Sequence, residues 1–328
     1  RAFLGIDFVE GSESEIEWNK TSIQAKTRRG FNPSGPETGI AIQHTCSDED
    51  KVYYAGYDPD GAATTLIYAR NLVDNTETNF AFGVSQGLNN GRTYSSALLV
   101  VTGDATNQIT GLCVGPDYLY AARGSQNEIY VIDKLTGQLV NTYSVIGTGL
   151  GTLNLNNPRR LKTRPEAGTT AISFINGPDD PADIRVATIS GNALTRPTGF
   201  MPDKVGLTHP LDFDLNVAGN ELMVLHGGAV QNMKGYTLSG TSTVVQWTYG
   251  AAGGNLTDVN VTNSTFYLSD SIALTNRCFV TFDPYGGKIY IGDPGNYRVV
   301  VLDSARNYVD QVVAMPTHYS APVNRTRP

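Results

Sequence analysis

The sequence has little charge, and the charge that it has is mostly acidic. Charged residues make up 17% of the 328 residues, against roughly 25% in typical soluble domains. With 24 Lys and Arg against 31 Asp and Glu, the formal net charge is -7. A nucleic acid is bound through clustered basic side chains that displace its counterions. The two basic clusters, Arg28-Arg29 and Arg159-Arg160-Leu161-Lys162, are expected to be solvated loop charges, so nucleic acid is not an expected partner.

Cysteines and long apolar runs are also scarce. Cys46, Cys113 and Cys278 are too few for a disulfide scaffold, and none lies in a metal-ligand spacing such as CxxC. We expect each to be a small buried apolar residue, with one disulfide as the alternative. No run approaches the roughly 20 apolar residues that span a bilayer, so no membrane span is expected in this segment. The chain begins at Arg1, which we interpret as a processed precursor or a piece of a longer chain.

Sequons for asparagine-linked glycans are present in a chain rich in Asn, Ser and Thr. They occur at Asn19, Asn255, Asn260, Asn263 and Asn324. Such a composition yields about as many sequons by chance, but three in one short stretch indicate an exposed loop if the sites are used. Low charge, candidate glycans and the missing initiator Met together favour an extracellular or cell-surface glycoprotein.

An internal repeat is the strongest signal in the sequence. From Cys278 to Met315 the chain reads FVTFDP, KIYIGD, PGNYRVVVLD and SARNYVDQVVAM. From Ile109 to Gly147 it reads GLCVGP, DYLYAA, RGSQNEIYVID and KLTGQLVNTYSV. Both segments give four runs of β-branched and aromatic residues separated by Gly, Asp, Asn or Pro. A meander of four strands is one blade of a β-propeller.

Weaker copies extend the repeat to five segments. They are IAIQHT with KVYYAGY, TTLIYAR and NFAFG; AISFIN with DIRVATIS; and LDFDLNV with ELMVLHG, NMKGYTL and TVVQWTYG. Residues 1–30 supply either a sixth blade or outer strands that close the ring. The predicted fold is therefore all-β, a single propeller of about six four-stranded blades over residues 1–315, with five to seven blades possible. Residues 316–328 contain three prolines and are predicted to be an extended tail or linker.

One stretch carries a family resemblance. KIYIGDPGNYRVVVLD, residues 288–303, resembles an NHL repeat, with Asp293, Gly295, Asn296 and Arg298 at the signature positions. The segment EIYVIDKLTGQLV is equally similar to the YVTN type of propeller. The resemblance implies that the four signature residues organise the turn between two strands. In the other blades, His226 and Ala121 are predicted to occupy the position of the Asp.

The NHL resemblance also brings two kinds of metal site into consideration. Related propellers include amidating lyases with zinc on histidines around the central channel, and calcium-dependent lactonases. His44, His209 and His226 are the candidate zinc ligands, but we expect them to lie at different heights, which suits one metal poorly. Candidate calcium ligands, which turn chemistry explains equally well, are Asp117, Asp212, Asp214, Asp283 and Asn176. The sequence holds no GxSxG, HExxH or P-loop motif, so no catalytic residue is assigned.

Three long connectors, residues 84–110, 148–170 and 251–277, should emerge on one face of a propeller. Loops on a rigid scaffold carry recognition, so we expect them to bind a protein or glycan; strands added to a neighbouring blade are the alternative. The predicted function is a non-enzymatic extracellular propeller, without a cofactor, serving as a binding or structural module of a cell-surface or filament-like assembly. The alternative is an NHL-like metal-dependent lyase or lactone hydrolase with calcium or zinc in the central channel.

Overall fold

The structure of the chain is a computed structural model that describes most of residues 41–313. Residues 1–40 and 314–328 lie outside the described residues, and with them the candidate sixth blade, the tail 316–328, Asn19 and Asn324. In the part that is described, no helix is long and apolar enough to cross a membrane. Further gaps in the description fall at residues 59–63, 75–77, 79, 82–85, 89–91, 95–97, 102–108, 148–151, 167–168, 197–202, 259, 269–277 and 297.

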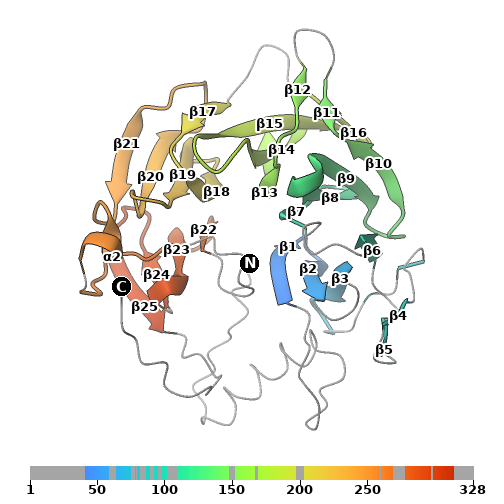
Figure 1. Cartoon of the computed structure of the whole chain (residues 1–328), viewed down its shortest axis with the longest axis horizontal. Helices are drawn as coiled ribbons and strands as arrows, with labels where there is room; N and C mark the ends of the chain where they lie inside the picture. Colours follow the sequence, from blue (N-terminus) through green and yellow to red (C-terminus); the bar gives the residue numbers. More distant parts are fainter. Residues whose placement is uncertain are drawn as a thin grey trace.

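Five antiparallel sheets follow one another along the described chain and are arranged around a common centre (Figure 1). Blade 1 comprises β1 (Ala41–Ser47), β2 (Lys51–Asp58), β3 (Thr64–Asn71) and β6 (Leu98–Val101). Blade 2 comprises β7 (Gly111–Val114), β8 (Tyr118–Arg123), β9 (Glu128–Asp133) and β10 (Leu139–Tyr143). Blade 3 comprises β13 (Arg159–Glu166), β14 (Thr169–Asn176), β15 (Ala182–Ser190) and β16 (Ala193–Thr195), with β17 (Lys204–Leu207) also paired to β15.

The last two blades have the same order of strands. Blade 4 comprises β18 (Pro210–Asn216), β19 (Glu221–His226), β20 (Asn232–Thr237) and β21 (Val245–Tyr249). Blade 5 comprises β22 (Phe279–Asp283), β23 (Lys288–Asp293), β24 (Arg298–Leu302) and β25 (Tyr308–Val313). The prediction of an all-β propeller is confirmed. The five blades of the described residues fall within the predicted range of five to seven.

Alternation along the strands explains why the blades stack. In β9, Ile129 and Val131 pack in the cluster shared with blade 3, whereas Tyr130 and Ile132 pack toward blade 1. Because successive side chains of a strand point to opposite faces, one blade fills two interfaces. Four such apolar clusters join blade 1 to 2, 2 to 3, 3 to 4 and 4 to 5. Each blade is thus stabilised mainly by its neighbours, as in other repeat folds.

The first strand of each blade lies nearest the centre of the ring. In Figure 1, β1, β7, β13, β18 and β22 surround the axis, while β10 and β21 lie at the rim. Side chains link these inner strands in addition to the apolar clusters. The Thr163 hydroxyl on β13 donates to the Val114 carbonyl on β7, and the Arg160 guanidinium donates to the carbonyls of Leu211 and Cys278. The axis is therefore lined by polar groups that hold blades together.

The outer part of the seam between blades 4 and 5 is closed by a three-residue polar clamp. The Trp247 indole N–H on β21 and the Arg306 guanidinium both donate to the Glu221 carboxylate on β19. The Arg306 guanidinium also lies over the Trp247 ring, 4.6 Å from its centroid. The ring covers Gly235 on β20 so closely that a Cβ there would lie 2.1 Å from it. Gly235 is thus required by the position of Trp247.

For the first connector the structure favours the alternative, a strand added to a neighbouring blade, and for the second it corrects the prediction of a loop. Residues 84–110 include the fourth strand of blade 1, β6, as well as a hairpin of β4 (Gln86–Leu88) and β5 (Arg92–Tyr94). The predicted fourth strand, NFAFG, was wrong because Phe80 packs as a buried residue between blades 1 and 2. The apolar run at β6 pairs with β3 in its place.

The prediction that residues 148–170 form a loop is wrong. It contains β12 (Leu153–Asn154), which pairs with β11 (Val145–Ile146), and the whole inner strand β13. The strand begins with basic residues, which are predicted from the sequence to be solvated loop charges. Arg159 and Arg160 are in fact buried. Their guanidinium groups satisfy carbonyl groups near the axis, which compensates for the burial of charge.

Candidate functional site

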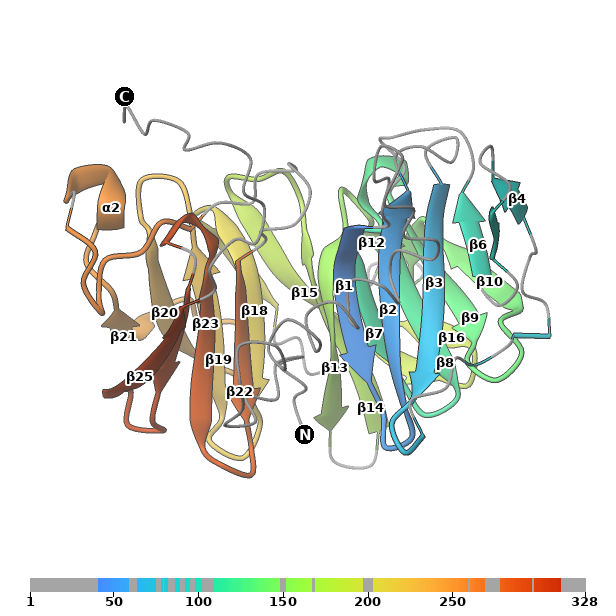
Figure 2. The ribbon, with the colours of Figure 1, turned by 90° about the horizontal axis from the view of Figure 1, so that it is seen from below.

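The third connector contains a compact loop, residues 251–268, which we call the connector platform. It includes the one-turn helix α2 (Gly254–Thr257) and, among its described residues, no strand. Backbone hydrogen bonds close the loop on itself: Ala251 N–H donates to Ser264 O, and Asn255 N–H to Phe266 O. In Figure 2, α2 lies at the upper edge of the ring, opposite the hairpin between β22 and β23.

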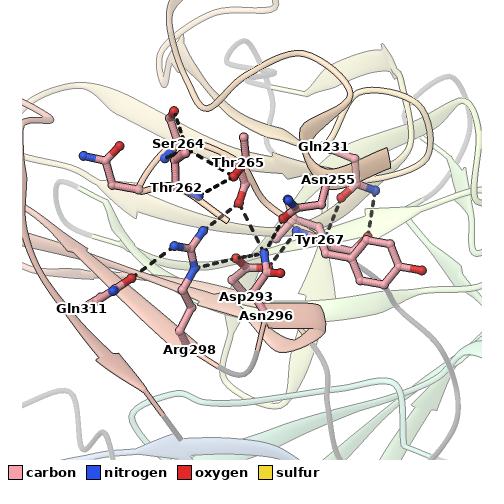
Figure 3. A network of polar contacts seen from close by, with 12 residues as sticks. Gln231, Asn255, Thr262, Ser264, Thr265, Tyr267, Asp293, Asn296, Arg298 and Gln311 are labelled. Carbon is pink, nitrogen blue, oxygen red and sulfur yellow. Dashed lines mark hydrogen bonds and ion pairs between the residues drawn. The ribbon is translucent and has the colours of Figure 1, made fainter. Parts of the chain in front are cut away.

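A buried ion pair in blade 5 anchors the platform. The Asp293 carboxylate, at the end of β23, accepts from the Arg298 Nε at 2.8 Å and from the Tyr267 backbone N–H at 2.8 Å. The Arg298 guanidinium in turn donates to the Thr265 carbonyl at 2.7 Å. Both charged side chains are almost fully buried, at 0% and 3% exposure. Figure 3 shows how this pair contacts two points of the platform backbone.

Asn296 and Gly295 complete the anchor from the 3-10 turn η3 (Pro294–Asn296). The Asn296 amide nitrogen donates to the Asp293 carboxylate at 2.8 Å and to the Asn255 side-chain oxygen at 2.7 Å. Gly295 donates its N–H to the Tyr267 carbonyl, and a Cβ at Gly295 would lie 1.8 Å from the Tyr267 ring. The four signature residues thus organise this turn, and they also bind the loop that precedes the blade.

A glutamine from blade 4 holds the platform from the other side. The Gln231 side chain, which is buried, donates to the Leu268 carbonyl at 2.9 Å and accepts the Leu268 N–H. Next to these bonds, Phe266 and Leu268 insert into the apolar cluster between blades 4 and 5. The platform is therefore fixed to two blades by both packing and hydrogen bonds.

Blade 2 carries the same pair with its charges exchanged. Arg123 ends β8 as Asp293 ends β23, and it forms an ion pair with Glu128 at 3.0 Å across to β9. The register matches, since Arg123 opposes Glu128 as Asp293 opposes Arg298. The prediction that Ala121 takes this position was therefore wrong by two residues. His226 does end β19, in the position predicted for it.

The outer surface of the platform is uncharged apart from one aspartate and partly apolar. Leu256, Val261 and Tyr267 are 54%, 51% and 43% exposed. The sequence AAGGNLTDVNVTNSTFYL has no Lys or Arg, and Asp258 is its one acidic residue. Recognition loops commonly combine Tyr with Ser, Gly and Asn, which offer contact area and adaptable hydrogen bonds. The platform has this composition on a rigid base.

The axis of the ring presents a second set of polar groups. One oxygen of Asp212 accepts the Val280 N–H at 3.0 Å, and one oxygen of Asp214 accepts the Phe282 N–H at 2.7 Å, so β18 is joined to β22. Burial raises the pKa of the Asp214 carboxyl, and the Lys162 ammonium offsets part of this effect. Burial also lowers the pKa of Lys162, but Asp214 and Asp212 outweigh it and the net direction is upward.

The expectation that the three histidines lie at different heights does not hold for His209 and His226, which are neighbours: Pro210 pairs with His226, and the Gly227 N–H donates to the His209 carbonyl. His44 is buried on the inner strand β1, and His209 lies in the turn before β18. His226 has both ring nitrogens occupied: Nδ1–H donates to the Thr208 carbonyl, and Nε2 accepts the Tyr236 hydroxyl at 2.9 Å. Within the described ranges, no three His, Cys, Asp or Glu side chains come together in a way that could hold a metal ion.

The other predicted polar residues and the cysteines have structural surroundings. Asn176 bridges the backbone of Asn156 and Asn154, and Asp283 accepts the Tyr285 N–H in a turn. None of the three cysteines, all of which are described, forms a disulfide; Cys113 and Cys278 are buried as expected, whereas Cys46 is partly buried. Burial raises the pKa of Cys113 to about 12, so this thiol stays protonated and unreactive at neutral pH.

Comparison with known proteins identifies the fold and no family. No family model matches the sequence, and no curated protein matches it either. Similar solved structures include a nidogen/laminin complex, with a TM-score of 0.51 at 13% identity over 84% of this chain and 80% of that chain. A virginiamycin B lyase from Staphylococcus aureus gives a TM-score of 0.43 at 11% identity, covering 83% and 70% of the two chains. A putative 6-phosphogluconolactonase from Bacteroides uniformis gives a TM-score of 0.47 at 13% identity, over 83% of this chain and 85% of that chain.

This chain is a β-propeller. At 13% identity the likeness to the nidogen/laminin complex shows the fold alone. Propellers of this kind serve both in binding and in catalysis. The NHL and YVTN families therefore stay a prediction that rests on the sequence of blades 5 and 2.

Proposed function

We propose that this propeller is a non-enzymatic module that binds a protein partner through the connector platform, as part of an extracellular or cell-surface assembly. The observation that carries the proposal is the fixed position of the platform. The pair Asp293–Arg298 and the buried Gln231 hold the loop backbone at several points, so its exposed side chains are presented in one arrangement. The Asp293 carboxylate accepts the Tyr267 backbone N–H of the platform, and the Arg298 guanidinium donates to the Thr265 carbonyl.

The chemistry of the exposed surface supports a protein partner. Leu256, Val261 and Tyr267 offer apolar area, while the surrounding Asn, Thr and Ser side chains offer hydrogen bonds. A loop held in its binding conformation loses little conformational entropy when it binds, which raises affinity. The near-absence of charge favours a partner surface that is also weakly charged. The acidic net charge of -7 supports the same view by disfavouring nucleic acid.

Site-specific photo-crosslinking would test the proposal in cells that produce the protein. A photoreactive amino acid replaces Leu256 in one variant and Leu135 in a matched control, since Leu135 is also an exposed leucine, 68% accessible, but belongs to blade 2. We expect a crosslinked protein adduct at position 256 and none at 135. Adducts at 135 alone, or none at 256, would contradict the proposal.

A paired mutational test then asks whether the contact contributes affinity. With the crosslinked partner purified, Leu256→Ser combined with Val261→Ser should weaken binding at least tenfold, since two apolar contacts are lost. Leu135→Ser combined with Val205→Ser removes the same kind of exposed side chain elsewhere and should leave the affinity unchanged. Equal effects of the two double variants would show that the platform has no special role.

A further inference from the structure

The three sequons of the connector platform differ in what their asparagines do. They are Asn255-Leu256-Thr257, Asn260-Val261-Thr262 and Asn263-Ser264-Thr265. All three asparagines lie among the described residues. Asn255 is partly buried beneath the loop, whereas Asn260 and Asn263 are exposed. In the sequence the three asparagines are equivalent candidate acceptors. In the structure they differ in exposure and in the hydrogen bonds of their side chains.

Both amide hydrogens of Asn255 are used inside the platform. The Asn255 Nδ2 donates to the Asp258 carbonyl at 2.9 Å and to the Asn260 carbonyl at 3.0 Å. Its side-chain oxygen accepts from Asn296 at 2.7 Å. A side-chain amide has two N–H groups, and attachment of a glycan replaces one of them. A glycan on Asn255 would therefore break the hydrogen bond from Nδ2 to the carbonyl of Asp258 or of Asn260, and so loosen the loop.

Asn260 and Asn263 have room for a substituent. The Asn260 Nδ2 makes one hydrogen bond, to the Asp258 carboxylate at 3.1 Å, which leaves its second hydrogen for replacement. Asn263 contributes its backbone carbonyl to the Tyr249 hydroxyl, and within the described structure its side chain makes no hydrogen bond. A glycan on either residue would extend into solvent without breaking the platform.

We propose that Asn260 and Asn263 are the N-glycan acceptors of this loop and that Asn255 is a structural residue that must remain unmodified. The third residues of the two sequons refine the proposal. Thr262 is exposed, whereas Thr265 is buried and donates to the Asn260 carbonyl at 2.7 Å. The Asn263 sequon is therefore accessible to a transferase only before folding, and the Asn260 sequon is accessible both before and after.

Glycopeptide mapping of the chain secreted from a glycosylating eukaryotic host tests the assignment. Enzymatic release in heavy-oxygen water marks each occupied asparagine as a heavy aspartate. We expect occupancy at Asn260 or Asn263, or at both, and below about a tenth at Asn255. Substantial occupancy of Asn255 in folded monomer would overturn the structural role. An absence of glycan at both Asn260 and Asn263 would overturn the acceptor role.

A second measurement tests the role of Asn255 without glycans. In protein made in a bacterial host, Asn255→Gln should lower the thermal midpoint by several degrees, because the longer side chain misplaces its two donors. Asn263→Gln is the matched control and should leave the midpoint within about one degree. Equal midpoints for the two variants would show that Asn255 does not hold the loop. This inference rests on the hydrogen bonds and exposure of the three asparagines and not on the proposed protein partner, and a glycan on Asn260 would adjoin Val261 of the proposed contact surface.

Discussion

At the scale of single residues, several of the few charged side chains form internal ion pairs. The pairs Asp293–Arg298 and Arg123–Glu128 occupy the same register position in blades 5 and 2 with opposite polarity. What the position requires is a complementary pair that joins the second strand to the third, and either order of charges meets that requirement. The pair of blade 5 also holds the connector platform, through Tyr267 and Thr265.

Replacing Asp293 by Asn should be strongly destabilising. The substitution keeps the shape but leaves the buried Arg298 without its counter-charge, and removing one partner of a buried pair costs about 3–5 kcal/mol. Chemical denaturation of the variant should show this loss in the free energy of unfolding. Asp283→Asn, which changes an aspartate that serves a single turn N–H, should cost much less. Similar losses for both variants would argue against a special role of the pair.

His226 should make the stability of the propeller sensitive to mild acid. Burial lowers the pKa of its imidazole from 6.5 to about 4, so the folded state prefers neutral histidine. Stability is complete above the unfolded pKa of 6.5 and is lost as the pH falls from there toward 4, because the unfolded chain binds the proton first. At about 1.4 kcal/mol per pKa unit the full loss is about 3 kcal/mol.

Denaturation at pH 7.5 and 4.5 measures this dependence. His226→Gln can still donate to the Thr208 carbonyl and accept from Tyr236, but it does not titrate. We expect the wild-type chain to lose more stability than the variant between the two pH values. If both lose the same amount, the acid sensitivity lies in other groups.

At the scale of elements, the connector platform behaves as part of the scaffold. Phe266 and Leu268 are buried between blades 4 and 5, and the loop provides acceptors for Arg298. Shortening residues 251–277 to a tight turn should therefore destabilise the fold. The sequence alone favours the opposite outcome, an intact fold with weaker binding, since the loop reads as a polar insertion.

Two variants separate the base of the platform from its tip. Phe266→Ala should cost about 3–5 kcal/mol by leaving a cavity at a fully buried site. Leu256→Ser, at the exposed tip, should leave the unfolding free energy nearly unchanged. Circular dichroism during thermal unfolding gives both values, and a stable Phe266→Ala variant would mean that the loop is only peripheral to the core.

The success of prediction also varied by element. Blades 2, 4 and 5 were read from the sequence because their strands combine apolar alternation with Gly, Asn and Asp at the turns. The inner strand β13 cannot be predicted from the pattern, because RRLKTRPE carries charges and a proline, and the acceptors of those charges lie on other blades. The signature residues that anchor the platform can be identified in the sequence. Their contacts with Tyr267 and Thr265 cannot, because these depend on how the chain folds.

At the scale of the whole molecule, two carboxylates near the centre of the ring bind the backbone of the neighbouring blade. Asp212 and Asp214 join β18 to β22. Their negative charges raise the pKa of Lys162, which lies on β13, against the effect of its burial. One oxygen of each carboxylate accepts a backbone N–H across the two blades. The proposed binding module and its alternative, a metal-dependent lyase or lactonase, differ in whether these carboxylates also bind a metal.

Elemental analysis distinguishes these two functions directly. After dialysis against a weak chelator, the purified chain is measured by inductively coupled plasma mass spectrometry. We expect less than about 0.1 equivalent of zinc or calcium per chain. A stoichiometric metal that is lost in Asp212→Ala or Asp214→Ala would contradict the proposed function and support the enzyme alternative.

The clamp between blades 4 and 5 also gives the molecule an intrinsic optical probe. The chain contains two tryptophans, of which Trp247 lies under the Arg306 guanidinium with its indole N–H on Glu221. With Trp18 replaced by Phe, all tryptophan fluorescence comes from this seam. Because indole emission shifts with the polarity around the ring, its wavelength would report in real time whether these two blades stay closed when the platform next to them binds.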